Sequence, residues 1–450
     1  MPPVMQPALQ RPAPQRPRGL AALTVVMVLF FVMALVAAYT NRNLIFEQRI
    51  SANNYRSARA LAAADGGVDW TLALLNGGRV NNACEPSVDP ADDDFRSRYL
   101  ATGGNDPAIA EGGYEVATWG GAANTKFFPA CIGRDGALTC VCPSAAVPTP
   151  ALAPPADGIG SSHRITFLLP GNAVRPGTIE FAARGCASPG SGDTACFAPT
   201  NRTPVVDALA TTLTTAGLVR ALPIAPTATL TAGGQITATA GGSLQVANGD
   251  AATGITAHAG LAINPTPASN FQGVGPGSEG RLNSDAALAA LAAAPNDGWF
   301  RALFGMDPAT YRRQPAVVRV ACAAGCSRAD LAAVFNGYPR NPIWVDGNLA
   351  LDSAAGIGTV ANPLMLIVTG TLTLSAAVDI VGFVHADAVN WSAGADAASL
   401  RGALVARTDF TATTTATLQY DRPVLDTIRL RYGSFVRAPG GWNLTTVNFN

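Results

Sequence analysis

An uncharged apolar run near the N-terminus constrains this chain more than any other feature. Residues 20–40 carry no charged side chain and follow a proline-rich leader that contains Arg11, Arg16 and Arg18. A helix needs about 20 apolar residues to cross a bilayer, and this run has that length. A removable signal peptide has a shorter apolar stretch and a small-residue cleavage site, and no such site follows here. The run is therefore predicted to remain in the protein as a transmembrane helix.

The helical pattern continues beyond this run. Apolar residues recur at steps of three and four through residues 41–76, and charged residues such as Glu47 and Arg49 occupy the other face. The whole of 20–76 is therefore predicted to form a transmembrane and stem helix, with Gly66-Gly67 as a weak point. The arginines of the leader, residues 1–19, favour a cytoplasmic location for it and place the rest of the chain outside the inner membrane.

A basic leader that ends in Gly19, followed by an apolar helix that runs on, resembles a type IV prepilin N-terminus. The stretch "LIFEQRISANNYRSARALAAADGGVDW" (residues 44–70) resembles more narrowly the PilX-type minor pilins, in which E-x-R, Asn, Arg and Ala-Ala-(Glu/Asp)-x-Gly follow in that order. This resemblance implies that prepilin peptidase cuts between Gly19 and Leu20 and that the new N-terminus is methylated. It also assigns Glu47 and Arg49 to the assembly helix.

One position departs from the pilin pattern. Most pilins have glutamate five residues after the cut, where this chain has Thr24. A carboxylate within the bilayer is costly without a partner, and in the family it is thought to meet the amine of a neighbouring subunit. Thr24 therefore favours a subunit that starts a fibre or caps its tip. The alternative is that the threonine hydroxyl simply bonds back to its own helix.

The cysteines indicate an oxidising compartment. Their even number and short spacings favour disulfides over a zinc site, because no histidine lies near a cysteine group. We expect Cys186–Cys196, Cys322–Cys326 and two bridges among the first four. The candidates are Cys84, Cys131, Cys140, Cys142, Cys186, Cys196, Cys322 and Cys326.

The middle of the chain reads as irregular. Residues 77–160 are predicted to form a disulfide-stapled subdomain that ends in a Pro/Ala linker. An acidic cluster lies within it, and calcium binding is one interpretation. A solvated helix start, capped by aspartate before Phe95, explains the same residues with fewer requirements. The cluster consists of Asp89, Asp92, Asp93 and Asp94.

The remainder is rich in short strands. Residues 161–215 form a predicted strand-rich subdomain, and 216–450 a domain of short, regularly spaced strands with Gly and Asn turns. This spacing leaves no room for crossover helices and favours a parallel β-solenoid, with a β-sandwich as the alternative. A helical insertion is predicted at about 284–336, with Ser327 and Asp330 as a capping pair. The fold class is thus α+β: a long N-terminal helix followed by a mainly β region.

Few residues point to chemistry. His385 and Asp387 would share one face of a strand, with Asp379, Asp346 and Asp352 nearby, but a turn and a strand edge explain them equally well. Five aromatic residues either pack in the core or form a ligand-stacking surface. They are Trp344, Phe383, Trp391, Phe435 and Trp442. No motif for a cofactor, a metal or a nucleic acid appears, and we predict that the chain is not an enzyme.

These patterns, with the resemblance, favour a minor pilin of a type IV pilus. It would be processed by prepilin peptidase, would assemble with other minor pilins and the major pilin, and would present its β-rich domain to partners such as a large tip adhesin. Its location would be the inner membrane, with a periplasmic domain, and then the extracellular pilus. The alternatives are a minor pseudopilin of a type II secretion system and a membrane-anchored β-solenoid protein that acts on carbohydrates.

Overall fold

A long helix followed by a mostly β region makes up the chain, as the sequence predicts. The computed structural model describes residues 18–101, 115–116, 128–134, 137–143, 160–168, 177–188, 209–294, 297–392, 394–395 and 397–444. The chain divides into two units, Met1–Ala58 and Arg59–Asn450.

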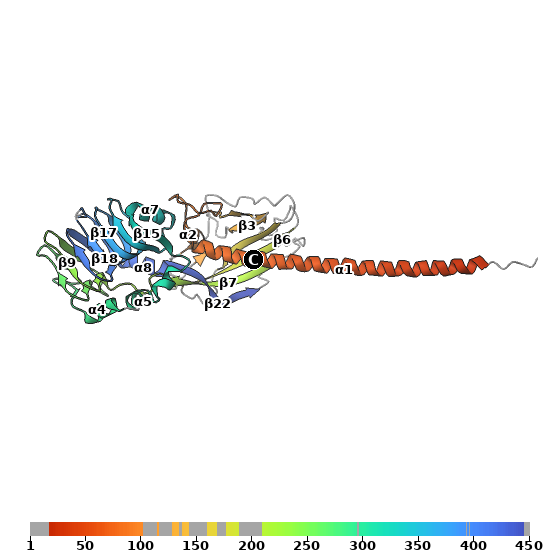
Figure 1. Ribbon diagram of the computed structural model, residues 1–450, viewed down its shortest axis with the longest axis horizontal. Helices are drawn as coiled ribbons and strands as arrows, with labels where there is room; N and C mark the ends of the chain where they lie inside the picture. The colour runs from red at the N-terminus through yellow and green to blue at the C-terminus, as the bar shows by residue number, and fades with distance from the viewer. Residues whose placement is uncertain are drawn as a thin grey trace, which may run out of the picture. The chain divides into compact units, whose positions relative to one another are not determined.

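Helix α1 runs without a break from Arg18 to Leu75 (Figure 1). No proline interrupts this stretch, and residues with good helix propensity such as alanine and leucine dominate it. The predicted weak point at Gly66 and Gly67 does not break the helix. Glycine at 67 has a packing reason, because a Cβ there would lie 3.0 Å from the ring of His163.

The end of this helix packs against an antiparallel sheet of six strands. Its order is β22-β7-β6-β5-β3-β4. The strands are β3 (Ala130–Arg134), β4 (Ala137–Val141), β5 (Gly160–Leu168), β6 (Thr178–Ser188), β7 (Leu209–Arg220) and β22 (Gly433–Leu444). Close by in the chain are α2 (Phe95–Tyr99) and a two-stranded sheet of β1 (Leu100–Ala101) and β2 (Glu115–Val116). The described parts of 77–160 thus contain α2 and the strands β1 to β4, and the last described strand, β22, returns to this sheet.

The last turns of α1 pack against this sheet through small side chains. Ala60, Ala64 and Val68 are buried. Strand β6 passes so close that a Cβ on Gly185 would lie 2.1 Å from the carbonyl oxygen of Ala60. The stem helix is therefore part of the core of this domain, and its alanines are required for the close approach.

A second sheet contains fourteen strands, and every pair that we describe in it is parallel. Its first group is β8 (Ala228–Ala232), β9 (Ile236–Ala238), β10 (Ser243–Ala247), β11 (Ile255–Ala259), β12 (Ile263–Asn264), β13 (Asn270–Gln272) and β14 (Arg281–Leu282). Its second group is β15 (Val318–Ser327), β16 (Ile343–Leu351), β17 (Leu364–Leu374), β18 (Asp379–Trp391), β19 (Ser399–Ala406), β20 (Phe410–Ala412) and β21 (Thr415–Tyr420). The sheet curls into a parallel half-barrel.

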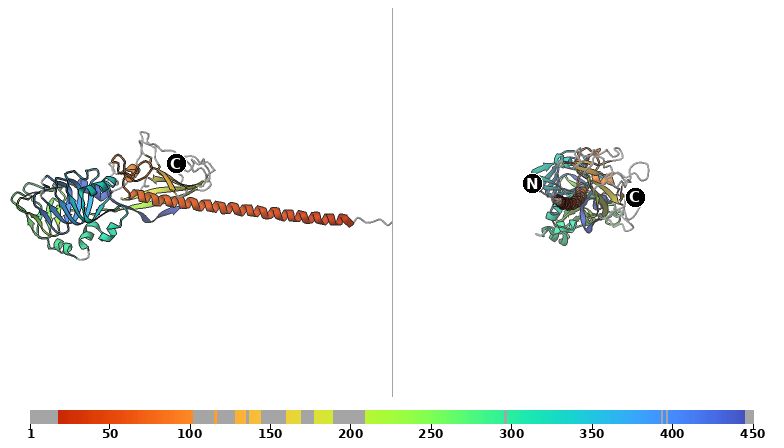
Figure 2. Two further views of the ribbon diagram at one scale, coloured as in Figure 1. Left: turned by 45° about the horizontal axis from the view of Figure 1, so that its top comes forward. Right: turned by 90° about the vertical axis from the view of Figure 1, so that its right-hand side faces the viewer.

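The stacking order in this sheet differs from the chain order. Strands β15 to β19 pair in sequence, but β19 then pairs with β8, and β8 with β11. In Figure 2 the green strands of the first group accordingly lie beyond the blue strands of the second. The chain first forms the strands at one end of the sheet, β8 to β14. After the helical insertion it forms β15 at the opposite end, and β16 to β19 then lead back to β8.

Aliphatic side chains stack in register inside the curl. Pairs join Leu366 with Val384, Val384 with Leu404, and Leu404 with Leu230. All four side chains are at most 1% exposed. Parallel strands with both faces covered carry such continuous apolar runs, and this stack forms the main core of the sheet.

Helices cover the outer face of the same strands. The insertion contains α4 (Ala286–Ala293), α5 (Gly298–Phe304) and α6 (Pro308–Arg312) (Figure 1). The aromatic side chains of α5 and α6 pack on the outward row of β16 to β19. Within the predicted insertion, Val318–Ser327 is the strand β15 instead of helix. Helix α7 (Arg328–Gly337) has the predicted capping box of Ser327 and Asp330. Helix α8 (Arg422–Arg431) leads into β22.

Two paired glycines allow the backbones of two neighbouring strands to approach closely. Gly382 and Gly402 lie opposite each other on β18 and β19. Gly402 has φ +138°, and a Cβ there would lie 1.9 Å from the carbonyl oxygen of Gly382. No other residue type fits this position without moving the backbone.

A buried polar junction ties the end of α1 to β22 and to the segments that precede β15 and β16. The Asn76 amide donates to the carbonyl oxygen of Phe435 and accepts from its N–H, both at 2.8 Å. Asn341 donates to the carbonyl oxygens of Asn76 (2.9 Å) and Ala316 (2.8 Å). The Arg96 guanidinium donates to the carbonyl oxygens of Leu75 and Gly433. Sequence patterns gave no sign of this junction.

Candidate functional site

The first part of α1 exposes an apolar surface whose contact with water is energetically unfavourable. Side chains such as Phe30 (74% exposed), Met27 and Leu35 project from the helix. Within the described residues, α1 is the one helix long and apolar enough to cross a membrane; its most apolar window has a mean hydropathy of 2.6 and no buried residue. Surfaces of this size mark interaction with lipid or with other apolar helices.

The predicted assembly residues lie along this helix. Gly19 and Leu20 belong to its first turns, and Thr24, Glu47 and Arg49 are all exposed. The Thr40 hydroxyl donates to the carbonyl oxygen of Val36 at 2.8 Å, which shows how a hydroxyl is satisfied within an apolar helix. The positions of all five residues are thus described, but their roles in processing and assembly remain predictions.

Disulfides join the cysteines within local groups. Cys84 pairs with Cys142 and Cys131 with Cys140, which are two bridges among the first four cysteines. Cys322 pairs with Cys326 beside α7. Cys186 is also disulfide-bonded. Cys196 lies outside the described residues, so that the Cys186–Cys196 bridge remains a prediction.

The acidic cluster before α2 serves local structure. The Asp94 carboxylate caps α2 by accepting from the Ser97 N–H at 3.0 Å, as the capping interpretation predicts. Asp92 lies 3.9 Å from Arg98, and Asp89 accepts from the Ala91 N–H. In the described part of the chain, no three His, Cys, Asp or Glu side chains gather as metal ligands.

The proposed stacking aromatics do not share a surface. Trp391, Phe383 and Phe435 are at most 1% exposed and belong to three different core clusters. Trp344 packs beneath the helical insertion. Trp442 alone is substantially exposed, at 43%, and its indole N–H points to Asp65. The interpretation as core residues holds for four of them, and the stacking surface is wrong.

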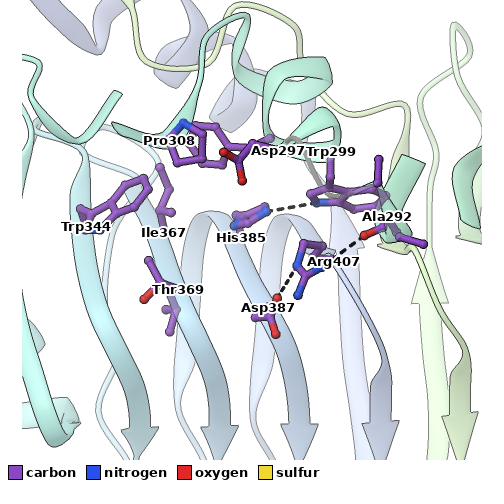
Figure 3. A pocket seen from close by; sticks show the side chains of 14 residues that line it. Ala292, Asp297, Trp299, Pro308, Trp344, Ile367, Thr369, His385, Asp387 and Arg407 are labelled. Atoms are coloured by element: carbon purple, nitrogen blue, oxygen red, sulfur yellow. Dashed lines mark hydrogen bonds and ion pairs between the residues drawn. The ribbon is translucent and has the colours of Figure 1, made fainter. Parts of the chain in front are cut away.

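His385 lines a cleft of about 470 Å³ between the helical insertion and the parallel sheet (Figure 3). It is 6% exposed and accepts a hydrogen bond at Nε2 from the Trp299 indole N–H at 3.1 Å. The rings of Phe300 and Phe304 contact it edge-on. Burial, assisted by the charge of Arg407, lowers the pKa of His385 to about 3. The imidazole is therefore neutral at physiological pH, with its proton on Nδ1.

Asp387 lines the same cleft, as the shared-face prediction requires. Its carboxylate forms an ion pair with Arg407, which also donates to the carbonyl oxygen of Ala292 at 3.2 Å (Figure 3). Thr369 lies on the neighbouring strand and accepts from the Gly347 N–H. With Asp387 in an ion pair and His385 Nε2 occupied, the arrangement suits binding better than proton transfer.

The other predicted carboxylates lie elsewhere. Asp346 pairs with Arg312 and Arg319, and Asp379 accepts from the Ser399 hydroxyl. Asp352 is exposed at the end of β16.

Sequence reasoning missed Arg407 and Trp299 as neighbours of His385. A repeat carries the signal for Arg407. "GFVHAD" ends at Asp387 and "GALVAR" at Arg407, so stacked strands place the two side chains together. Trp299 comes from the insertion and has no such signal.

Comparison with known protein families gives a match near the N-terminus of the chain. Residues 18–69 match the model of the PilX N-terminal family. No curated protein matches the chain. Among solved structures, the DUF3494 domain of Shewanella frigidimarina ice-binding protein 1 is 16% identical, covering 45% of this chain and 99% of that chain with a TM-score of 0.20. A TM-score this low carries no argument.

The family match covers the same part of α1 that exposes the apolar surface. PilX proteins are structural pilins rather than enzymes. Residues 18–69 therefore belong to the PilX N-terminal family and give this protein a PilX-type pilin N-terminus.

Proposed function

We propose that this protein is a minor pilin, which enters a type IV pilus after prepilin peptidase has cut between Gly19 and Leu20. The observation that carries the proposal is the exposed apolar first part of α1, within a segment that matches the PilX N-terminal family. In the inner membrane this surface contacts lipid. In a fibre it contacts the same segment of other minor pilins and of the major pilin, so that lipid contacts are replaced by helix packing.

Thr24 supports a position at or near the tip. A subunit inside the fibre has a neighbour whose amine stabilises a carboxylate in the apolar core. A subunit without that neighbour gains nothing from the carboxylate, and threonine satisfies its hydroxyl within the helix. The protein thus primes assembly and remains at the end of the fibre that it starts.

The β-rich unit is the part that the pilus presents to partners, including a large tip adhesin. We propose that its parallel strands stack as coils of a β-solenoid. The registered pairs from Ile343 through Leu366, Val384 and Leu404 to Leu230 support this arrangement, because each lies one coil from the next. The disulfides suit folding in the periplasm and survival outside the cell.

Substitution at the cleavage site tests the proposal. Gly19→Val is expected to leave an uncut precursor in the inner membrane and to remove the protein from sheared fibres. Ala21→Val places the same valine side chain two residues later and is the matched control. Mass spectrometry of the N-terminal peptide and of sheared fibres provides the measurement. Fibres that contain the Gly19→Val chain with its leader intact would overturn the proposal.

A further inference from the structure

Gly66 lies inside helix α1 at a position where the described chain does not require a glycine. Glycine weakens the interior of a helix relative to alanine, because it has more backbone freedom to lose. Its neighbour Gly67 has a packing reason, since a Cβ there would lie 3.0 Å from the ring of His163. Gly66 is exposed, and a Cβ there would meet no described atom within 4 Å. A glycine of this kind is suited to close approach by a second helix.

An exposed tryptophan borders the residue before this glycine. Trp442 of β22 is 43% exposed, whereas the other tryptophans in the described part of the chain are buried or half-buried. Its indole N–H donates to the Asp65 carboxylate at 3.4 Å, which holds the ring next to the helix. Because tryptophan is among the residues that most often dominate protein interfaces, an exposed and oriented Trp442 marks a contact surface.

Two carboxylates complete this surface. Among the described residues, Asp65 accepts only from neutral donors, which are the Trp442 N–H and the Thr212 hydroxyl, both at 3.4 Å. Asp69 lies one turn further along α1 and forms an ion pair with Arg437 at 3.1 Å, but its side chain is 78% exposed. Both carboxylates are therefore accessible to a basic side chain from a partner. We call this surface the Trp442 face; it consists of Asp65, Gly66, Asp69 and Trp442.

The family match and the charges favour a pilin helix as the partner. The match to the PilX N-terminal family covers residues 18–69, and it includes three of the four residues of the Trp442 face together with the exposed apolar segment. The stem of this chain, residues 41–59, contains four arginines and one glutamate. A stem of this type is basic, so it complements the two carboxylates of the face.

We propose that the Trp442 face binds the basic stem of a neighbouring pilin helix in the fibre. That helix crosses α1 at Gly66, packs against the ring of Trp442 and places a basic side chain at Asp65. The inference deepens the proposed pilin function and rests on it, because it names a contact surface outside the apolar segment. It also gives β22, the last described strand, a part in assembly.

Gly66→Leu separates folding from assembly at this position. Leucine favours the helix, and its Cβ meets no described neighbour, so the thermal midpoint of the purified full chain should stay the same or rise by a few degrees. The same side chain blocks close approach, so the variant should fall about tenfold or more in sheared fibres, counted by mass spectrometry against wild type. Gly249→Leu, exposed in equally open space on the parallel sheet, is the matched control and should assemble as wild type does.

Photo-crosslinking identifies the partner. With p-benzoylphenylalanine in place of Trp442, irradiated fibres should yield a cross-linked peptide from the stem of another pilin, and Asp65→Asn should reduce its yield several-fold. Absence of the wild-type chain from fibres would refute the pilin function itself. With wild type present in fibres, equal amounts of Gly66→Leu, or cross-links only to other segments, would overturn this inference alone. A lowered midpoint for Gly66→Leu would also overturn it, because the fold itself would then require the glycine.

Discussion

The junction at Asn76 makes a quantitative prediction about stability. Asn76 is 8% exposed and Phe435 is 1% exposed. In the Asn76→Ala variant the Phe435 N–H and C=O each lose the hydrogen bond to Asn76 in a buried setting. Each unsatisfied buried group costs about 1–3 kcal/mol. The expected loss is thus about 3 kcal/mol for the contact between the end of α1 and β22.

Hydrogen exchange followed by mass spectrometry measures this loss where it occurs. A local destabilisation of about 3 kcal/mol accelerates exchange roughly 100-fold in peptides of β22 and of the last turn of α1. Asn54→Ala, on the exposed face of the same helix, removes the same group without removing a buried partner and is the matched control. Exchange in β22 that is equally slow in both variants would refute the reasoning.

Two further predictions concern the parallel sheet. Gly402→Ala places a Cβ against the Gly382 carbonyl and should cost about 3 kcal/mol or more in the free energy of unfolding, whereas Gly249→Ala, with open space around it, should cost under about 1 kcal/mol. Thermal unfolding of the two variants checks this, and equal midpoints would contradict it. Burial lowers the pKa of His385 in the folded protein to about 3, whereas its ordinary value is 6.5. Between about pH 3 and pH 6.5 the imidazole is therefore protonated in the unfolded chain and neutral in the folded one. Stability should therefore fall as pH drops from about 6.5 toward 3, by up to about 1.4 kcal/mol per pH unit from this group. In His385→Gln the loss of midpoint between about pH 7 and about pH 5 should shrink, and an unchanged loss would show that His385 does not cause it.

Local signals in the sequence predicted local structure well. The helix through 20–76 follows from one continuous pattern of apolar and helix-forming residues, and α1 ends at Leu75. The capping box of Ser327 and Asp330 and the cap at Asp94 are each contained within four residues, and both are present. Such features depend on neighbours along the chain, which a sequence displays directly.

Long-range pairing was beyond the reach of the same reasoning. The sequence pattern places all of 216–450 in one domain of short strands, whereas β22 pairs with β7 of the antiparallel sheet. Strand β15 lies between the helices α6 and α7, so the sequence pattern assigned it to the helical insertion. The cleft needs Trp299 from the insertion beside His385 from a strand, and only the folded packing of α5 brings these together.

The order in which the parallel sheet is stacked has a consequence for synthesis. Strand β8 pairs with β19, which the ribosome makes only after the helical insertion and strands β15 to β18. Until β19, β20 and β21 are made, strands β8, β9 and β10 of the first group each lack a later partner, and such bare edges invite pairing with other chains. A chain that stops short of Ser399 is therefore expected to leave β15 to β18 unjoined to the first group of strands, and strands are most easily gained or lost at the β14 end, where no later segment has to be fitted in.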